Sequence, residues 1–270
     1  MIQGLLSDAG PRLTFMNRSD NPFIAFLAII TAPIAAGALL LSWAPSNHFF
    51  DFAPEFDGYV AARDIRSVVE VTQDSTLTVF CDLDKNRGGM GTAWAIDKEI
   101  LQVESDKSVL MTNHHVIEDC IEGNFKLTVA KLYGKERSAR VLIYDKKNDL
   151  ALLEVDMKLK PLELSENFMW SGYWVMSLGS AAGYEGSVSF GNILNTTNED
   201  VLITNNISEG NSGGPLIDNE GKVVGIITWG SSDIYKEDFN GARKLDTFCL
   251  KIIKCEYEYK GKKTWYDWNN

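Results

Sequence analysis

Short runs of apolar and β-branched residues, broken by Gly, Asn and Asp, fill most of the chain after residue 66. Such runs, with turn signals between them, are typical of strands in sandwiches and barrels. The first set that we expect as strands is 67–72, 75–81, 91–96, 109–113, 125–132, 140–144 and 151–155. The second set is 173–178, 187–194, 201–204, 215–217 and 223–229, and 244–254 is expected as a short C-terminal helix. The pattern predicts an all-β fold.

The segment 23–43 is apolar and contains no charged residue. As a helix it spans roughly 30 Å, the thickness of a bilayer core, and Pro33 in its middle is tolerated at the cost of a kink. We expect one uncleaved transmembrane helix. A secretory signal peptide is the main alternative, but its apolar part is shorter and a cleavage site follows it, whereas Ser42-Trp43-Ala44-Pro45 is a poor one. A buried core helix is the other alternative.

The charges beside this segment predict its orientation. Arg12 and Arg18 precede it, and no Lys or Arg occurs in 44–62. The positive-inside rule then places the N-terminus in the cytoplasm and the bulk of the chain outside, in the cell envelope or periplasm. The expected organisation is a cytoplasmic segment 1–22, the membrane helix 23–43, a linker 44–62, a domain 63–256 and a tail 257–270. For the end of the chain we expect a surface tail or a final strand.

Charge and cysteine content restrict the partners and the compartment. The net charge of −11 argues against nucleic acid as a main partner. Four cysteines occur, at 81, 120, 249 and 255, and no pair has the C-x-x-C spacing of a zinc or redox site. An even number suits two disulfides in an oxidising compartment. Among three possible pairings we favour a disulfide between Cys81 and Cys120, and free buried thiols are the alternative.

The most specific motif is Gly210-Asn211-Ser212-Gly213-Gly214-Pro215-Leu216. A serine hydroxyl needs a neighbouring base to act as a nucleophile, and acyl transfer needs donors for an oxyanion. Glycines on both sides let backbone N–H groups converge and leave room for a substrate. A glycine-rich hairpin turn explains the glycines but not an exposed serine at their centre.

A base and an orienting acid are expected elsewhere in the chain. The three histidines are His48, in the linker, and the adjacent pair His114 and His115, where an apolar run enters a turn. The carboxylate candidate is Asp149, directly before the apolar run 150–153, while Asp145 is interpreted as an ordinary turn residue.

The order His, Asp, Ser resembles the trypsin-like serine proteases from about residue 66 to 253, and most of all the HtrA/DegP branch. The family pattern T-x-x-H-V selects His115, D-L-A-L-L selects Asp149, and G-N-S-G-G-P-L selects Ser212 as nucleophile. The resemblance implies a two-barrel trypsin-like (chymotrypsin) fold, with the backbone N–H groups of Gly210 and Ser212 as oxyanion donors.

The resemblance also implies where a substrate binds. Segment 225–230 is similar to the strand that pairs with the substrate backbone and lines the primary pocket, which gives Thr228, Trp229 and Gly230 as binding residues. Asn206, six positions before Ser212, falls near the base of that pocket and indicates an uncharged side chain rather than Arg or Lys. No cofactor and no metal are implied. Glu209 stands where the branch often has Pro.

The sequence therefore predicts a membrane-anchored serine endopeptidase acting on proteins or peptides. No residues follow the domain for the PDZ module of HtrA-like proteins, so delivery of substrates through such a module is not expected, and the oligomeric state is left open. The alternative is a catalytically latent binding or sensing module with a protease fold. An esterase with the same triad is a third reading.

Overall fold

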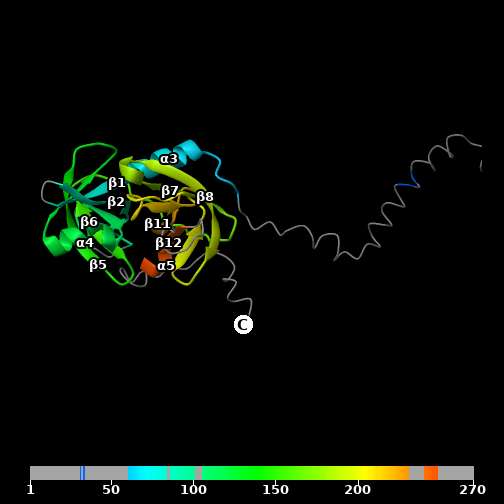
Figure 1. The fold of residues 1–270 in the computed structure, drawn as a ribbon. Helices are drawn as coiled ribbons and strands as arrows, with labels where there is room; N and C mark the ends of the chain where they lie inside the picture. The colour runs from blue at the N-terminus through cyan, green and yellow to red at the C-terminus, as the bar shows by residue number, and fades with distance from the viewer. Residues whose placement is uncertain are drawn as a thin grey trace, which may run out of the picture. The chain divides into compact units, whose positions relative to one another are not determined.

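Two closed barrels of six antiparallel strands each account for most of the chain that the structure describes (Figure 1). This computed structural model describes residues 60–83, 86–100, 105–230 and 240–248, together with Thr31 and Pro33. The chain divides into two compact units, Met1–Tyr59 and Val60–Asn270, and both barrels lie in the second unit.

Several predicted features lie outside the described residues. The expected transmembrane segment 23–43 is described only at Thr31 and Pro33, both helical, and the expected cytoplasmic segment, most of the linker with His48, and the tail are not described. Cys249 and Cys255 also lie outside the described residues. In the part of the chain that is described, no helix is both long enough and apolar enough to cross a membrane.

The first barrel joins its strands in the order β1-β2-β3-β6-β5-β4, and every neighbouring pair is antiparallel. β6 is buried along its whole length, which matches its nearly continuous apolar sequence. The strands are β1 (Thr76–Leu83), β2 (Asn86–Ile96), β3 (Ser108–Thr112), β4 (Lys126–Ala130), β5 (Arg137–Asp145) and β6 (Leu150–Val155).

The second barrel has the order β10-β11-β12-β9-β8-β7, again antiparallel throughout. A 3-10 turn, η1 (Ala181–Gly183), links its first two strands in chain order. The strands are β7 (Trp174–Gly179), β8 (Ser187–Thr196), β9 (Asp200–Ile203), β10 (Pro215–Ile217), β11 (Val223–Gly230) and β12 (Asn240–Lys244).

One buried cluster crosses from barrel to barrel. It combines Trp94, Met111 and Leu152 of the first barrel with Met176 and Ile226 of the second. Each side chain of this size contributes about 1.5–3 kcal/mol when it is fully buried. Because this cluster is shared, the barrels are held in a fixed relation, and the loops at their junction are held with them.

The all-β, two-barrel fold is confirmed, with one strand missed and one wrong. Strand β12 was not predicted, because the sequence Asn240-Gly241-Ala242-Arg243-Lys244 is polar and lacks β-branched residues. It is fixed by its pairing with β9 and β11 on either side. Helix α5 (Leu245–Phe248) covers the first part of the predicted segment 244–254, whose remainder is outside the described residues.

The prediction of a strand at 67–72 was wrong, because this segment lies in helix α3 (Ile65–Asp74). The Asp64 side chain caps the helix by accepting from the Ser67 backbone N–H at 3.1 Å. Val68 and Thr72, four residues apart, share the inward face of the helix, and Val68 packs on the core cluster shared by the barrels. The β-branched residues therefore mark an amphipathic helix.

Helix α4 (His114–Gly123) follows β3 directly and was not predicted. It ends at Asn124, which adopts the left-handed conformation with φ 50°. A disulfide joins Cys120 of this helix to Cys81 of β1, with the two Cα atoms 5.5 Å apart. The helix is therefore covalently tied to the barrel that it covers.

Candidate active site

The three residues that the sequence singles out come from three separate segments, one at the start of a helix and two in loops between strands. His115 lies in the first turn of α4, just after β3. Asp149 lies between β5 and β6, so both residues belong to the first barrel. Ser212 lies between β9 and β10 of the second barrel.

His115 and Asp149 are joined by two hydrogen bonds. The Asp149 carboxylate lies 2.7 Å from His115 Nδ1 through Oδ2, and it accepts from the His115 backbone N–H at 2.8 Å through Oδ1. The His115 side chain is 44% exposed and that of Asp149 is 22% exposed. With Nδ1 facing a carboxylate, a neutral imidazole carries its proton there and leaves Nε2 free to accept one.

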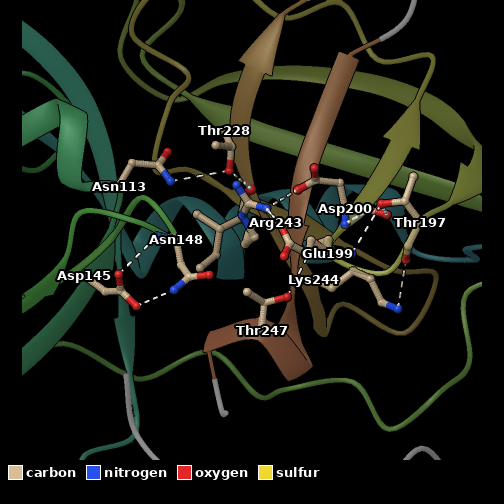
Figure 2. Close-up of polar contacts among 11 residues, drawn as sticks. Asn113, Asp145, Asn148, Thr197, Glu199, Asp200, Thr228, Arg243, Lys244 and Thr247 are labelled. Atoms are coloured by element: carbon tan, nitrogen blue, oxygen red, sulfur yellow. Dashed lines mark hydrogen bonds and ion pairs between the residues drawn. The ribbon is translucent and has the colours of Figure 1, made fainter. Parts of the chain in front are cut away.

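The two neighbouring residues that the sequence also offered, His114 and Asp145, make contacts within the fold. His114 is buried, and its ring lies 5.1 Å from that of Tyr144. Asp145 closes the turn before β6 by accepting from Asn148, from the backbone N–H at 3.1 Å and from the side-chain amide at 2.5 Å (Figure 2). Burial raises the pKa of Asp145, but hydrogen bonds from Asn148 and Lys147, together with the Lys147 charge, outweigh burial and hold that pKa below its ordinary value.

The loop that carries Ser212 packs against β2 and against the turn that leads to His115. The Thr92 backbone N–H donates to the Ser212 carbonyl at 2.8 Å. Gly213, with φ 85°, comes so close that a Cβ atom there would lie 2.1 Å from the Thr92 carbonyl oxygen and 3.2 Å from the Asn113 nitrogen. Only glycine fits this approach, which places the serine loop against the start of α4.

The peptide groups on both sides of Gly210, an expected oxyanion donor, are held by hydrogen bonds to their carbonyls. The Glu209 carbonyl accepts from the Ala182 backbone N–H at 2.8 Å, and the Gly210 carbonyl accepts from the Thr92 hydroxyl at 2.6 Å. Since C=O and N–H point to opposite sides of a trans peptide, the Gly210 N–H points away from Ala182. Within the described residues, neither Gly210 N–H nor Ser212 N–H donates a hydrogen bond.

The residues expected to bind substrate lie near one another at the end of β11. Thr228 is buried, Trp229 is half-buried and Gly230 is exposed. A Cβ atom on Gly230 would lie 3.9 Å from the carbonyl oxygen of Ile207, the residue after Asn206. The Asn206 side chain is exposed, and its backbone N–H donates to the Ser189 hydroxyl at 2.8 Å.

An ion-pair group that the sequence analysis missed lies on β12, the strand that pairs with β11, and on the residues at the start of β9 (Figure 2). Arg243 of β12 lies 3.0 Å from Asp200 and 3.2 Å from Glu199. Burial raises the pKa of Asp200, while the Arg243 guanidinium and a hydrogen bond from the Trp229 side chain oppose that rise. Arg243 and Asp200 are far apart in the chain, and their pairing follows from the register between β9 and β12. Among the described residues no group of His, Cys, Asp and Glu could hold a metal ion.

Two antiparallel six-stranded barrels, with His115 and Asp149 on the first and Ser212 on the second, define a trypsin-like double-barrel domain. Residues 91–226 match the family model described as trypsin-like peptidase domain, and the chain belongs to that family. The family model confirms the resemblance to trypsin-like proteases, and relatives named DegP-like and HtrB confirm the resemblance to the HtrA/DegP branch.

Curated relatives are similar over the same region. A probable periplasmic serine endoprotease, DegP-like, from Chlamydia muridarum is 31% identical over 137 residues, which cover 47% of this chain and 27% of that protein. The serine protease Do-like HtrB from Bacillus subtilis is 35% identical over 145 residues, covering 47% of this chain and 31% of that protein. This chain therefore spans less than a third of either relative's length.

A solved structure is similar over a longer part of the chain. The crystal structure of the serine endoprotease from Yersinia pestis aligns with a TM-score of 0.59 at 25% sequence identity. The alignment covers 70% of this chain and 66% of that one. This similarity supports the two-barrel trypsin-like fold of the present chain.

Proposed function

We propose that the chain is a serine endopeptidase in which Ser212 attacks a peptide carbonyl while His115 takes the hydroxyl proton. Asp149 holds the imidazole by Nδ1 and stabilises the imidazolium. His115 then gives the proton to the leaving amine, and water repeats the sequence to release the acyl group from Ser212. The reaction requires no cofactor.

The His115–Asp149 pair is the observation that carries this proposal. A carboxylate that accepts from both the ring and the backbone of one histidine fixes that ring in position and in tautomer. The approach of Gly213 to Asn113 brings the loop of Ser212 to the same end of α4. These contacts support a proposed base and nucleophile that come from different barrels.

The free backbone donors support acyl transfer in particular. The N–H groups of Gly210 and Ser212 are unused within the described residues, and the Glu209 carbonyl is held away by Ala182. Preorganised donors of this kind stabilise the tetrahedral oxyanion, typically by about 2.7–4 kcal/mol for each donor. Glu209 is therefore compatible with a formed oxyanion site.

Substrate would lie along the end of β11, at Thr228, Trp229 and Gly230. The uncharged Asn206 favours a small or medium uncharged side chain at the cleavage site. A protein or peptide substrate is favoured over a simple ester. Although Gly210 to Gly214 also fits G-x-S-x-G, Ser212 leads into strand β10 rather than the helix of an α/β-hydrolase elbow.

We also propose that the protease domain lies outside the cytoplasm, anchored by the apolar segment 23–43. The absence of charge in that segment and the arginines before it support this placement. The disulfide between Cys81 and Cys120 suits an oxidising compartment. The name of the DegP-like relative describes that protein as periplasmic.

Labelling with a fluorophosphonate tests the proposal, with intact mass as the readout. We expect one adduct on the wild-type chain and none on Ser212→Ala, which should also lower kcat for peptide hydrolysis by about 10⁴ to 10⁶. A folded wild-type chain without an adduct would favour the latent binding module instead. Cleavage of esters without any cleavage of peptides would favour an esterase.

A further inference from the structure

Asn113 occupies the short connection between β3 and α4, two residues before His115. Its side chain is fully buried, at 0% exposure for the residue. The amide Nδ2 donates to the backbone carbonyl of Asp149 at 2.7 Å and reaches the Thr228 hydroxyl at 3.4 Å. Figure 2 shows this side chain directed from the first barrel toward Thr228 on β11.

The orientation of the Asn113 amide follows from its partners. The Asp149 carbonyl can only accept, so the NH₂ end must face it. The Thr228 hydroxyl donates to the Ile226 carbonyl at 2.9 Å, which leaves its lone pairs available to accept from Asn113. The Asn113 oxygen is buried and has no partner within the described residues, so the amide serves here as a donor.

Asp149 depends on this hydrogen bond because its backbone is strained. Its φ is 54°, in the left-handed region that residues other than glycine rarely adopt. Such a conformation persists only where the surroundings hold it on several sides. Here the carboxylate is held by His115 and the carbonyl by Asn113.

The same amide links the His–Asp pair to the second barrel. Thr228 follows Ile227, whose backbone N–H and C=O bond to Gly214 and Gly213 at 2.8 Å each. A hydrogen-bonded path therefore runs from Asp149 through Asn113 to the strand expected to bind substrate and to the serine loop.

We infer that Asn113 is a positioning residue, which fixes the Asp149 carboxylate against His115 and couples that pair to Thr228 on β11. The inference rests on the proposed function and adds to it. Asn113 itself touches no reacting atom. Its loss should impair proton transfer from Ser212 more than substrate binding.

The test compares variants of the full chain with a fluorogenic peptide substrate. Asn113→Leu keeps the branched skeleton without a donor, Asn113→Asp keeps the size, and Thr228→Val removes the hydroxyl while keeping the shape. Thr128→Val is the matched control, because it deletes a buried hydroxyl on β4 whose partner is the Glu136 carboxylate at 2.9 Å. Unfolding curves on a Ser212→Ala background show which variants remain folded.

We expect Asn113→Leu and Asn113→Asp to lower kcat on the order of 10- to 10²-fold, as small misplacements of catalytic groups do, with KM changed less than about threefold. Combining Asn113→Leu with Thr228→Val should lower kcat by less than the product of the single effects, since both break one connection. Thr128→Val should keep kcat within about twofold of the wild type.

A second readout does not depend on activity. Proton NMR of the wild-type chain should show a far-downfield signal from the proton between His115 and Asp149, absent in His115→Gln. We expect this signal to be lost or shifted in Asn113→Leu and retained in Thr128→Val. If the wild type neither cleaves peptides nor reacts with fluorophosphonate, the proposed function fails, and this signal still decides the role of Asn113.

Two results would overturn the role of Asn113. One is a folded Asn113→Leu chain with unchanged kcat and an unchanged downfield signal. The other is a loss of kcat in Thr128→Val as large as that in Asn113→Leu, which would mean that removing any buried hydrogen bond lowers kcat equally.

Discussion

Removal of the Cys81–Cys120 disulfide should cost the domain a large part of its stability. The bond joins positions 39 residues apart in the chain. The chain-entropy relation for a loop of that length gives about 13 cal/mol/K, or about 4 kcal/mol at 25 °C. Both cysteines are buried in a cluster with Leu77, Val79 and Val116, so replacing them with alanine removes packing as well, about 1–2 kcal/mol. The total is comparable with the whole free energy of unfolding of a marginal domain.

Urea unfolding measures this effect most directly. The Cys81→Ala/Cys120→Ala chain is compared with its parent, both carrying Ser212→Ala to prevent self-cleavage. We expect a lower midpoint, and a larger m value because the unfolded chain without the cross-link exposes more surface. Reductant should cause the entropic part of this loss in the parent, because it breaks the cross-link but leaves the buried sulfurs in place. Its effect on the double variant reports any contribution from Cys249 and Cys255.

A loss below about 1 kcal/mol would refute the entropic reasoning for this loop. A large loss of unfolding free energy with an unchanged m value would mean that the effect comes from the packing of the buried sulfurs instead. Both results are distinguishable from misfolding, because the near-ultraviolet spectrum of the native double variant is recorded before urea is added.

Two further substitutions test the local geometry by unfolding on the same background. Gly213→Ala should lower the free energy of unfolding by about 2–5 kcal/mol, because φ is 85° there and the new Cβ would lie 2.1 Å from a carbonyl oxygen. Gly172→Ala is the control, since φ is 94° but nothing lies within 4 Å, so its loss of about 1–2 kcal/mol measures the backbone strain alone. Equal losses in the two variants would contradict the steric account. Hydrogen bonds from Ser105 and Arg140, opposed by burial, lower the pKa of Glu154 below 4.5, so its stabilisation is present above that pH and disappears as the pH falls below it. Glu154→Gln should therefore cost about 1–2 kcal/mol at pH 7 and progressively less under acid, whereas a constant difference across pH would show that the charge is irrelevant.

The family motifs in the sequence selected His115 over His114 and Asp149 as the orienting acid, and in the structure these two residues are hydrogen-bonded to each other. Asn113 was passed over, because nothing in the sequence shows that its amide meets the carbonyl of a residue 36 positions away.

Secondary structure was predicted well where one face or both faces of a strand are apolar. The first error concerned α3, since the β-branched residues at 67–72 suit a strand by propensity but here lie in a helix, in which Val68 and Thr72 face inward and Val71 is exposed. The second concerned β12, whose polar residues become strand only through pairing with both neighbours. In both cases tertiary contacts outweighed local preference.

By itself, the sequence determined the strand-rich character of the chain, its family, and the order of the candidate catalytic residues. These properties are local, because they depend on turn residues, apolar runs and short motifs. The tertiary structure alone decided the left-handed backbone of Asp149, the contact of Gly213 with the start of α4, and the pairing of Arg243 with Asp200. Those features join segments that meet only when each barrel closes and the two share one core, so no stretch of sequence contains them.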